Sequence, residues 1–356
     1  MIALSPKQRH SVPQSPPSPA GALVAAGVRG AALFAGRAYE PAWGDPVLGA
    51  LSTLAALRPK PHRLSLTRFR RGYDRLGLIF GRTKAQSRVE SLRLSGAAGP
   101  LQARRYRPPS LPRGRLVYFH GGGFSIGSIA SHDHFCRFIS EASGAEIISV
   151  EYRLAPEHPF PAGVEDAIAS LRGAADNQLW LSPDLPLVVG GDSAGGNLAL
   201  IAAQQAGSGL IDGLWLVYPT VGGTLDMLDS NRRLPDSFGL PRETAAWFLN
   251  TYAPDPDQHD HAWMQPGAAL DCAGLPPTYL GLVERDLLFE GGMNFARRLD
   301  DLGVAQRTDT FAGIPHAFIH MIGVSAASHA AACKLGQGLG WLFEKAGHSS
   351  ESRNDH

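Results

Sequence analysis

The sequence predicts an α/β fold: a mostly parallel central sheet with helices on both faces. Three observations carry this prediction. From residue 116 onward, short apolar and β-branched runs alternate with helical stretches, an order typical of parallel sheets. One of these runs ends in a serine between glycines, at Gly191 to Gly195, and a helical stretch follows directly. Another run ends in three consecutive glycines, residues 121–123.

Composition places the chain among globular proteins with a substantial core. It has 356 residues, of which 44% are hydrophobic and 18% charged, and its formal net charge is +1. This charge gives no reason to expect a nucleic acid partner. Three widely spaced cysteines argue against a disulfide framework and favour a reducing cytoplasm.

The N-terminal 40 residues are expected to form a poorly ordered tail. Residues 1–20 are rich in proline, serine and basic side chains, which bury little apolar surface. The apolar stretch 20–38 is interrupted by Arg29 and lacks a clean cleavage site, so we do not interpret it as a signal peptide. No run is long enough for a stable membrane span.

Residues 45–82 have a helical pattern with two different faces. Phe69, Tyr73 and Phe80 recur at helical spacing, while Arg68 and Arg71 lie on the opposite side. A basic amphipathic helix of this kind can make weak contact with a lipid surface, which is one interpretation. A solvated charged face is the interpretation that we favour.

The remaining elements follow from periodicity. Alternation with period two predicts two antiparallel strands near residues 89–94 and 101–106. Six further strands are expected at residues 116–119, 146–150, 187–189, 214–218, 279–283 and 308–311. Helices are expected near residues 135–142, 164–173, 197–205, 292–302 and 328–345. A polar C-terminal tail is expected over 347–356.

The serine between glycines has the G-x-S-x-G spacing of a nucleophile elbow. Gly191 and Gly195 flank Ser193, where strand and helix must pass close together. Such a turn exposes the serine hydroxyl for attack on a carbonyl, but the five-residue pattern alone also fits an ordinary strand-to-helix loop.

The glycine triplet lies in His120-Gly121-Gly122-Gly123-Phe124, directly after a predicted strand. Glycines at this position let backbone N–H groups turn toward a ligand, and in acyl transfer they hold the oxyanion. A phosphate-binding loop is the rival interpretation. It is disfavoured because neither G-x-G-x-x-G nor a P-loop lysine is present.

Together these motifs resemble a known family. The segments HGGGF, VEYRLAPEHPFPA, GDSAGGN, DLLFEGGMNFARRL and IPHAF occur in this order. They resemble the hormone-sensitive-lipase-like branch of the α/β-hydrolases, the bacterial family IV esterases. The resemblance covers roughly residues 45–344 and implies an α/β-hydrolase core over 86–346.

The resemblance implies a Ser-Asp-His triad and an oxyanion hole. The nucleophile carries over to Ser193, and the oxyanion donors to the backbone N–H groups of Gly122, Gly123 and Ala194. The base carries over to His316, while the nearby His320 is interpreted as structural.

The acid of the triad carries over to Asp286. The family usually has proline after this aspartate and another aspartate four residues on, whereas this chain has Leu287 and Glu290. Glu284 and Glu290 are the competing carboxylates, and a helix-capping role is the alternative for Asp286.

Several other polar segments are interpreted as scaffold. Tyr152 to Pro159 is expected to form turns around a buried carboxylate network. Asp192 and Asn197 are expected to brace the elbow. The His-Asp-His triplets at 132–134 and 259–261 are taken as loop residues without the spacing of a zinc site, so no metal and no cofactor are expected.

A helical cap over the strand ends is also implied by the resemblance. Its first part would be residues 41–85, and an insertion at about 221–263 would complete it. Apolar side chains of the cap and of the glycine loop are candidates for the acyl pocket, or for packing of cap on core: Phe124, Trp247, Phe248 and Tyr252.

The implied function is hydrolysis of short- to medium-chain carboxylic esters through an acyl-enzyme. A deacetylase or amidase of related chemistry is an alternative that the triad does not exclude. A ligand-binding receptor on the same fold, as in plant gibberellin receptors, is a second alternative. Those receptors replace the catalytic histidine, whereas this chain keeps His316. A small-molecule ester is the expected partner, a homo-oligomer remains open, and a cytoplasmic location is expected.

Overall fold

The computed structural model describes residues 26–27, 43–57, 59–207, 209–222, 238–269 and 272–354. The expected N-terminal tail lies outside this part of the chain, apart from residues 26 and 27. Residues 223–237 of the expected insertion also lie outside it.

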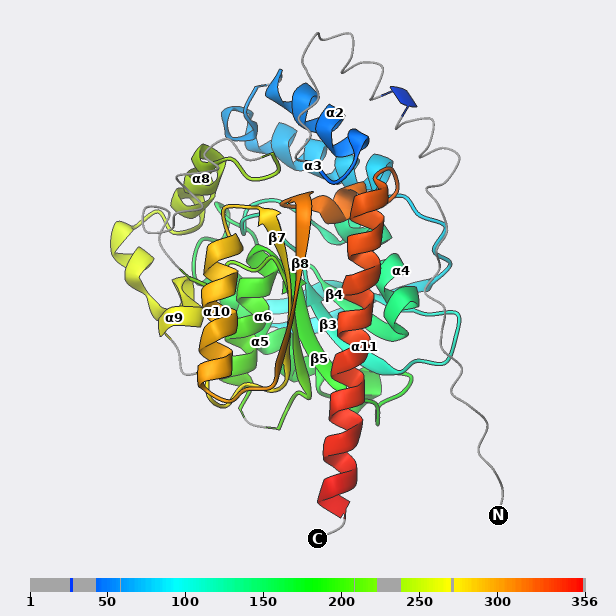
Figure 1. Cartoon of the computed structure of the whole chain (residues 1–356). Helices are drawn as coiled ribbons and strands as arrows, with labels where there is room; N and C mark the ends of the chain where they lie inside the picture. The colour runs from blue at the N-terminus through cyan, green and yellow to red at the C-terminus, as the bar shows by residue number, and fades with distance from the viewer. Residues whose placement is uncertain are drawn as a thin grey trace.

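An eight-stranded sheet forms the centre of the molecule (Figure 1), in the order β1-β2-β4-β3-β5-β6-β7-β8. The contacts of β2 with β1 and β4 are antiparallel, and all other neighbours are parallel. This confirms the predicted mostly parallel sheet. The strands are β1 (Arg88–Gly96), β2 (Gly99–Arg107), β3 (Gly114–Phe119), β4 (Ala145–Val150), β5 (Leu187–Asp192), β6 (Gly213–Val217), β7 (Thr278–Arg285) and β8 (Gln306–Pro315).

Helices cover both faces of the sheet, as predicted: α5, α6 and α10 lie on one face, α4 and α11 on the other (Figure 1). The helices are α2 (Pro46–Ala56), α3 (Leu66–Phe80), α4 (Ile129–Ser143), α5 (Ala162–Ala174), α6 (Ala194–Ala206), α8 (Arg242–Tyr252), α9 (Pro266–Ala269), α10 (Phe289–Asp301) and α11 (Ala326–Asn354). Short 3₁₀ turns are η1 (Pro61–Arg63), η2 (Asn177–Leu179), η3 (Pro256–Asp260), η4 (Ala262–Met264) and η5 (Phe318–Met321). Helix α11 includes most of the expected C-terminal tail.

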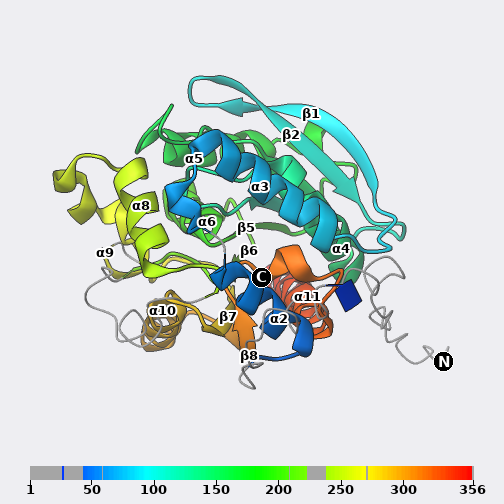
Figure 2. The same cartoon turned by 90° about the horizontal axis from the view of Figure 1, so that it is seen from above.

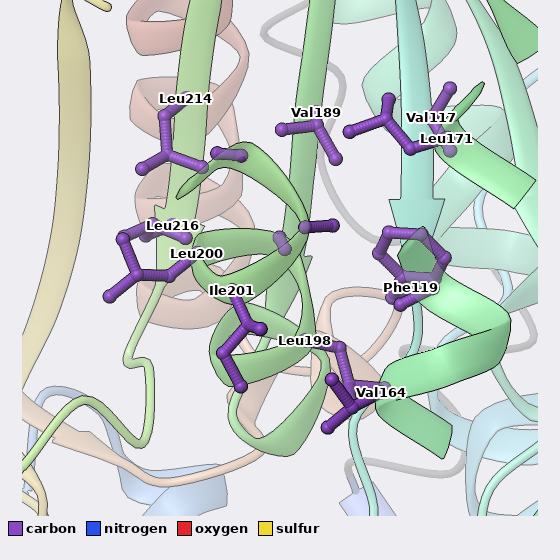
Figure 3. Packing of buried hydrophobic residues seen from close by; sticks show 14 of the residues in the cluster. Val117, Phe119, Val164, Leu171, Val189, Leu198, Leu200, Ile201, Leu214 and Leu216 are labelled. Carbon is purple, nitrogen blue, oxygen red and sulfur yellow. The ribbon is translucent and has the colours of Figure 1, made fainter. Parts of the chain in front are cut away.

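The two faces of the sheet bury separate apolar clusters. Along β3, Val117 and Phe119 pack toward α5 and α6 (Figure 3), whereas Leu116 and Tyr118 belong to the cluster on the opposite face. This alternation follows from the two-residue period of a strand. Because both faces are buried, the inner strands read as continuous apolar runs in the sequence.

Helices α2, α3 and α8 lie over the carboxyl ends of the parallel strands (Figures 1 and 2), and we call them the cap helices. On α3, Arg68 and Arg71 are exposed, as predicted, and Arg75 is exposed as well. On its opposite side, Phe69 contacts the ring of Phe248 and Tyr73 contacts that of His320. Among the described helices, none combines the length and the apolarity needed to cross a bilayer.

Candidate active site

Ser193 follows the last residue of β5 in a strained turn. Its backbone has φ 54° and ψ −118°, and its N–H donates to the carbonyl of Val217 on β6 over 2.9 Å. A Cβ on Gly195 would lie 2.0 Å from the carbonyl oxygen of Phe119, and one on Gly191 would lie 2.4 Å from the carbonyl carbon of Gly195. Only glycine fits at these two positions, because strand and helix pass too close for any side chain. The elbow is therefore not an ordinary loop.

The three residues proposed for the triad come together at the strand ends. The His316 Nε2 lies 2.9 Å from the Ser193 Oγ, and the His316 Nδ1 lies 2.6 Å from the Asp286 Oδ2. All three are buried, with exposed fractions of 7% for Ser193, 5% for His316 and 0% for Asp286. This chain of contacts has the geometry of a nucleophile, a base and an orienting acid.

The sheet register explains how Asp286 and His316 meet. Arg285 at the end of β7 pairs with Pro315 at the end of the parallel strand β8, so the next residue of each strand leaves the sheet at the same place. Of the competing carboxylates, Glu284 is exposed and Glu290 is half-buried on α10. The Oδ1 of Asp286 accepts from the N–H of Leu288 over 3.0 Å, which fixes the carboxylate.

The partners of His316 determine its tautomer. A carboxylate can only accept a hydrogen bond, so the proton of the neutral imidazole belongs on Nδ1, facing Asp286. Nε2 then carries the free lone pair and faces the Ser193 hydroxyl. In this arrangement the imidazole can accept a proton from the Ser193 hydroxyl.

The glycine loop presents backbone donors beside this serine. Gly122 and Gly123 have φ of 122° and 57°, which bulky residues rarely adopt. A Cβ on Gly122 would lie 2.2 Å from the carbonyl oxygen of Ile126. Within the described chain, the backbone N–H groups of Gly122, Gly123 and Ala194 donate to no other residue. They are thus free to bind a developing oxyanion.

Residues 116–320 match a family model described as an alpha/beta hydrolase fold. The chain belongs to the α/β-hydrolases. Within them it falls in the hormone-sensitive-lipase-like branch, which the sequence motifs resemble.

Several relatives of this α/β-hydrolase are named as esterases. Esterase LipI of Mycobacterium tuberculosis is 36% identical over 252 residues, covering 68% of this chain and 78% of LipI. Carboxylesterase NlhH of the same species is 37% identical over 256 residues, covering 68% of this chain and 77% of NlhH. A solved structure of an esterase from Pyrobaculum calidifontis superposes with a TM-score of 0.75 at 32% identity, covering 82% of this chain and 97% of that one.

Asp192 has a different role in this α/β-hydrolase from the one that the sequence suggested. Its carboxylate does not brace the elbow locally but spans to the glycine loop. It accepts from the N–H of Gly121 over 2.7 Å and from the Tyr118 hydroxyl over 2.5 Å. Burial alone would raise the pKa of Asp192, but the His132 imidazole and the Tyr118 donor outweigh it and hold the pKa well below its usual range. Asp192, the residue before Ser193, thus anchors the start of the glycine loop.

Asn197, the other expected brace, does act near the elbow. Its side-chain amide donates to the carbonyl of Thr220 over 2.9 Å, and the N–H of Thr220 donates to the carbonyl of Ser193 over 3.1 Å. The buried carboxylate network expected after Tyr152 centres on Asp166, which is fully buried and binds the guanidinium of Arg153.

The first His-Asp-His triplet was wrongly expected in a loop, because residues 132–134 lie in helix α4. His132 is buried beside His120 and His320, while Asp133 pairs with Arg137. In the described chain, no group of three or more histidine, cysteine or acidic side chains is arranged to hold a metal ion. His320 accepts or donates at 2.8 Å from the Tyr73 hydroxyl, which fits its expected structural role.

The buried histidines should make this α/β-hydrolase sensitive to acid. Burial and the His132 imidazole lower the pKa of His120 and of His320 from 6.5 to about 3. The folded state therefore stays neutral at these two side chains while the unfolded state binds protons below pH 6.5. Each histidine should lower the free energy of unfolding by about 1.4 kcal/mol per pH unit between pH 6 and 4.

Denaturant unfolding at a series of pH values measures this slope. Replacing His320→Gln should reduce the slope, because one buried titrating group is removed. The matched control is His158→Gln, at an exposed position, which should keep the wild-type slope. A His320→Gln variant with an unchanged slope would contradict the assignment.

The apolar residues expected at the pocket separate into two groups. Phe248 of α8 lies against the glycine loop, since a Cβ on Gly123 would be 2.2 Å from its ring. Trp247 contacts the Phe248 ring at a centroid distance of 5.2 Å. Phe124 stacks on Tyr252 at 3.9 Å, and Tyr252 is 2% exposed. Phe248 is therefore beside the oxyanion donors, whereas Tyr252 lies behind Phe124.

Proposed function

We propose that this protein is a serine carboxylesterase in which Ser193, His316 and Asp286 perform the chemistry. The observation that carries the proposal is the continuous chain of contacts from Asp286 through His316 to Ser193, beside three backbone N–H groups that donate to no other described residue. The named activities of the relatives support the reaction class. Fold similarity alone would not, because unrelated functions share this fold.

The first half-reaction forms an acyl-enzyme. The Ser193 Oγ attacks the ester carbonyl carbon while its proton moves to the His316 Nε2, and Asp286 stabilises the resulting imidazolium. The carbonyl oxygen becomes an oxyanion that accepts from the N–H groups of Gly122, Gly123 and Ala194. When the tetrahedral intermediate collapses, the bond to the leaving oxygen breaks and His316 returns its proton to the departing alcohol.

The second half-reaction releases the acid. Water attacks the acyl carbon, His316 accepts the water proton, and the same backbone donors hold the new oxyanion. Collapse breaks the bond to the Ser193 Oγ, which regains its proton from His316. The donors are preorganised, so they stabilise the charge without reorganising in the transition state.

The alternatives differ in how well the site supports them. A ligand-binding receptor does not need an imidazole in contact with the serine, and here the contact is 2.9 Å. A deacetylase or amidase uses the same triad and differs in the leaving group that the pocket admits. Comparing an ester with the matching amide, on the same acyl group, distinguishes these two activities.

We propose that the acyl chain lies against Phe124, Trp247 and Phe248, with Tyr252 supporting Phe124, and that chains are short to medium in length. The small exposure of Ser193 under the cap helices supports this. Replacing Phe248→Ala should open space beside Gly123, so the octanoate-to-butyrate ratio of kcat/KM should rise about tenfold. The measurement is hydrolysis of a p-nitrophenyl ester series.

The control for this series is Leu302→Ala, at an exposed leucine that follows α10 outside the cap. It should leave the chain-length profile unchanged. An unaltered profile in Phe248→Ala would assign that ring to packing between the cap and the core.

A cytoplasmic location is part of the proposal. The three cysteines, all in the described chain, form no disulfide, and two of them are buried. This supports a compartment in which thiols stay reduced. Fractionation of the source cells measures the location directly.

A further inference from the structure

The cap helix α3 contacts the oxyanion loop, residues 120–125, through the side chain of Arg70. Its Nε donates to the carbonyl of Ser125 over 2.9 Å, and its Nη2 donates to the carbonyl of Ala155 over 3.0 Å. Its Nη1 and Nη2 each donate to a carboxylate oxygen of Glu157 over 2.7 Å. One guanidinium thus joins α3, the oxyanion loop and the turn after Tyr152.

The oxyanion loop is fixed at two ends. At its start, the N–H of Gly121 donates to Asp192 over 2.7 Å. At its far end, the N–H of Ser125 donates back to the carbonyl of Gly122 over 3.1 Å, while the Ser125 carbonyl is held by Arg70. The donors of Gly122 and Gly123 lie between these two anchors. Movement of the Ser125 end would therefore shift the donors.

The contact with Glu157 serves to orient the Arg70 guanidinium and adds little to the stability of the fold. The pair is partly exposed, with side-chain exposures of 28% for Arg70 and 52% for Glu157, and such pairs contribute little to folding. The bidentate geometry fixes the plane of the guanidinium. With that plane fixed, two of the remaining N–H groups point at the carbonyls of Ser125 and Ala155.

We propose that Arg70 is a positioning residue for the oxyanion hole, through which the cap helix α3 holds the Gly122 and Gly123 donors in place. Arg70 touches no reacting atom. Arg70 acts on the substrate indirectly, because it holds the Ser125 carbonyl at the end of the loop that carries the Gly122 and Gly123 donors. The inference rests on the proposed esterase function and adds to it a link between cap and catalytic centre.

A comparison of oxo and thiono esters tests this link. In a thiono ester, sulfur replaces the carbonyl oxygen, and sulfur is a weak hydrogen-bond acceptor. A well-formed oxyanion hole therefore accelerates hydrolysis of the oxo ester more than hydrolysis of the thiono ester. Replacing Arg70→Met should lower kcat for p-nitrophenyl butyrate about tenfold, because the donors are displaced rather than removed. The rate with the thiono analogue should change little, so the oxo-to-thiono ratio of kcat should fall about tenfold, with KM nearly constant.

Three variants accompany Arg70→Met. Arg71→Met, at the exposed neighbouring arginine, should keep the wild-type ratio. Glu157→Gln should change the ratio less than Arg70→Met, because the bonds of Arg70 to the two carbonyls remain. Arg70→Lys should give an intermediate ratio, since a lysine lacks the planar fork, and it provides the test if Arg70→Met does not fold.

The outcomes distinguish this inference from the proposed function. If wild type hydrolyses the oxo ester and folded Arg70 variants keep the wild-type oxo-to-thiono ratio, the inference is overturned even where thermal stability falls. If wild type hydrolyses neither ester, the proposed function itself fails. A lower ratio in the Arg70 variants, with a wild-type ratio in Arg71→Met, supports the positioning role.

Discussion

Replacing Ser193→Ala is expected to lower kcat for p-nitrophenyl butyrate by about 10⁴- to 10⁶-fold. The Ser193 Oγ is the atom 2.9 Å from the His316 Nε2, and alanine has no group that can form the acyl-enzyme. Residual rate above the reaction in water should remain, because the Gly122 and Gly123 donors still bind an oxyanion. Steady-state kinetics with purified variant measures the loss.

The Ser193→Ala variant must be folded if the loss of kcat is to be assigned to the missing hydroxyl. The substitution removes one small polar atom and leaves the glycines of the elbow unchanged, so circular dichroism and the Tm should remain close to wild type. Ser91→Ala, on the edge strand β1, is the matched serine control and should retain activity. Turnover by folded Ser193→Ala within tenfold of wild type would remove Ser193 from its role.

The second large effect is expected from Asp286→Asn, with a fall in kcat of about 10⁴-fold. The Asp286 carboxylate accepts from the His316 Nδ1 over 2.6 Å, which keeps the proton on that nitrogen. An asparagine amide can donate to Nδ1 instead, and the other tautomer then places the proton on Nε2. Nε2 can no longer accept the Ser193 proton, so attack is slow.

Glu284→Gln is the control for this prediction. Glu284 lies two residues before Asp286 and is exposed, so the same chemical change there should leave kcat within a few fold of wild type. The pair of variants also tests the choice of carboxylate. A large loss in Glu284→Gln together with an active Asp286→Asn would reverse the assignment.

The sequence was sufficient to place the candidate catalytic residues after predicted strands of one mostly parallel sheet. Ser193 lies within a local pattern whose glycines have a steric cause. Asp286 follows the apolar run at residues 279–283, and His316 follows the more polar segment at residues 308–311, which was also expected to be a strand. Because parallel strands end at the same edge of the sheet, residues directly after them must lie close together. The triad itself was implied by the family that the motifs resemble, and the structure brings its three members into contact.

Contacts between segments far apart in the chain could not be predicted from the sequence. Arg70 and Glu157 are 87 positions apart, and helical periodicity assigns Arg70 to a face without naming its partner. Asp192 was assigned to the wrong neighbours for the same reason, since its partner Gly121 is 71 positions away. The triplet at 132–134 was expected in a loop because the predicted helix began only at residue 135, whereas Ser128 caps α4 just before the triplet.

The most direct test of the account is to locate a covalent label. A p-nitrophenyl alkylphosphonate reacts with an activated serine and releases p-nitrophenol, leaving the phosphonyl group on the attacking oxygen. We predict one label per chain, mapped by peptide mass spectrometry to Ser193 and absent in Ser193→Ala. A label on another residue, or no label on protein that hydrolyses p-nitrophenyl butyrate, would contradict the central claim that Ser193 is the nucleophile.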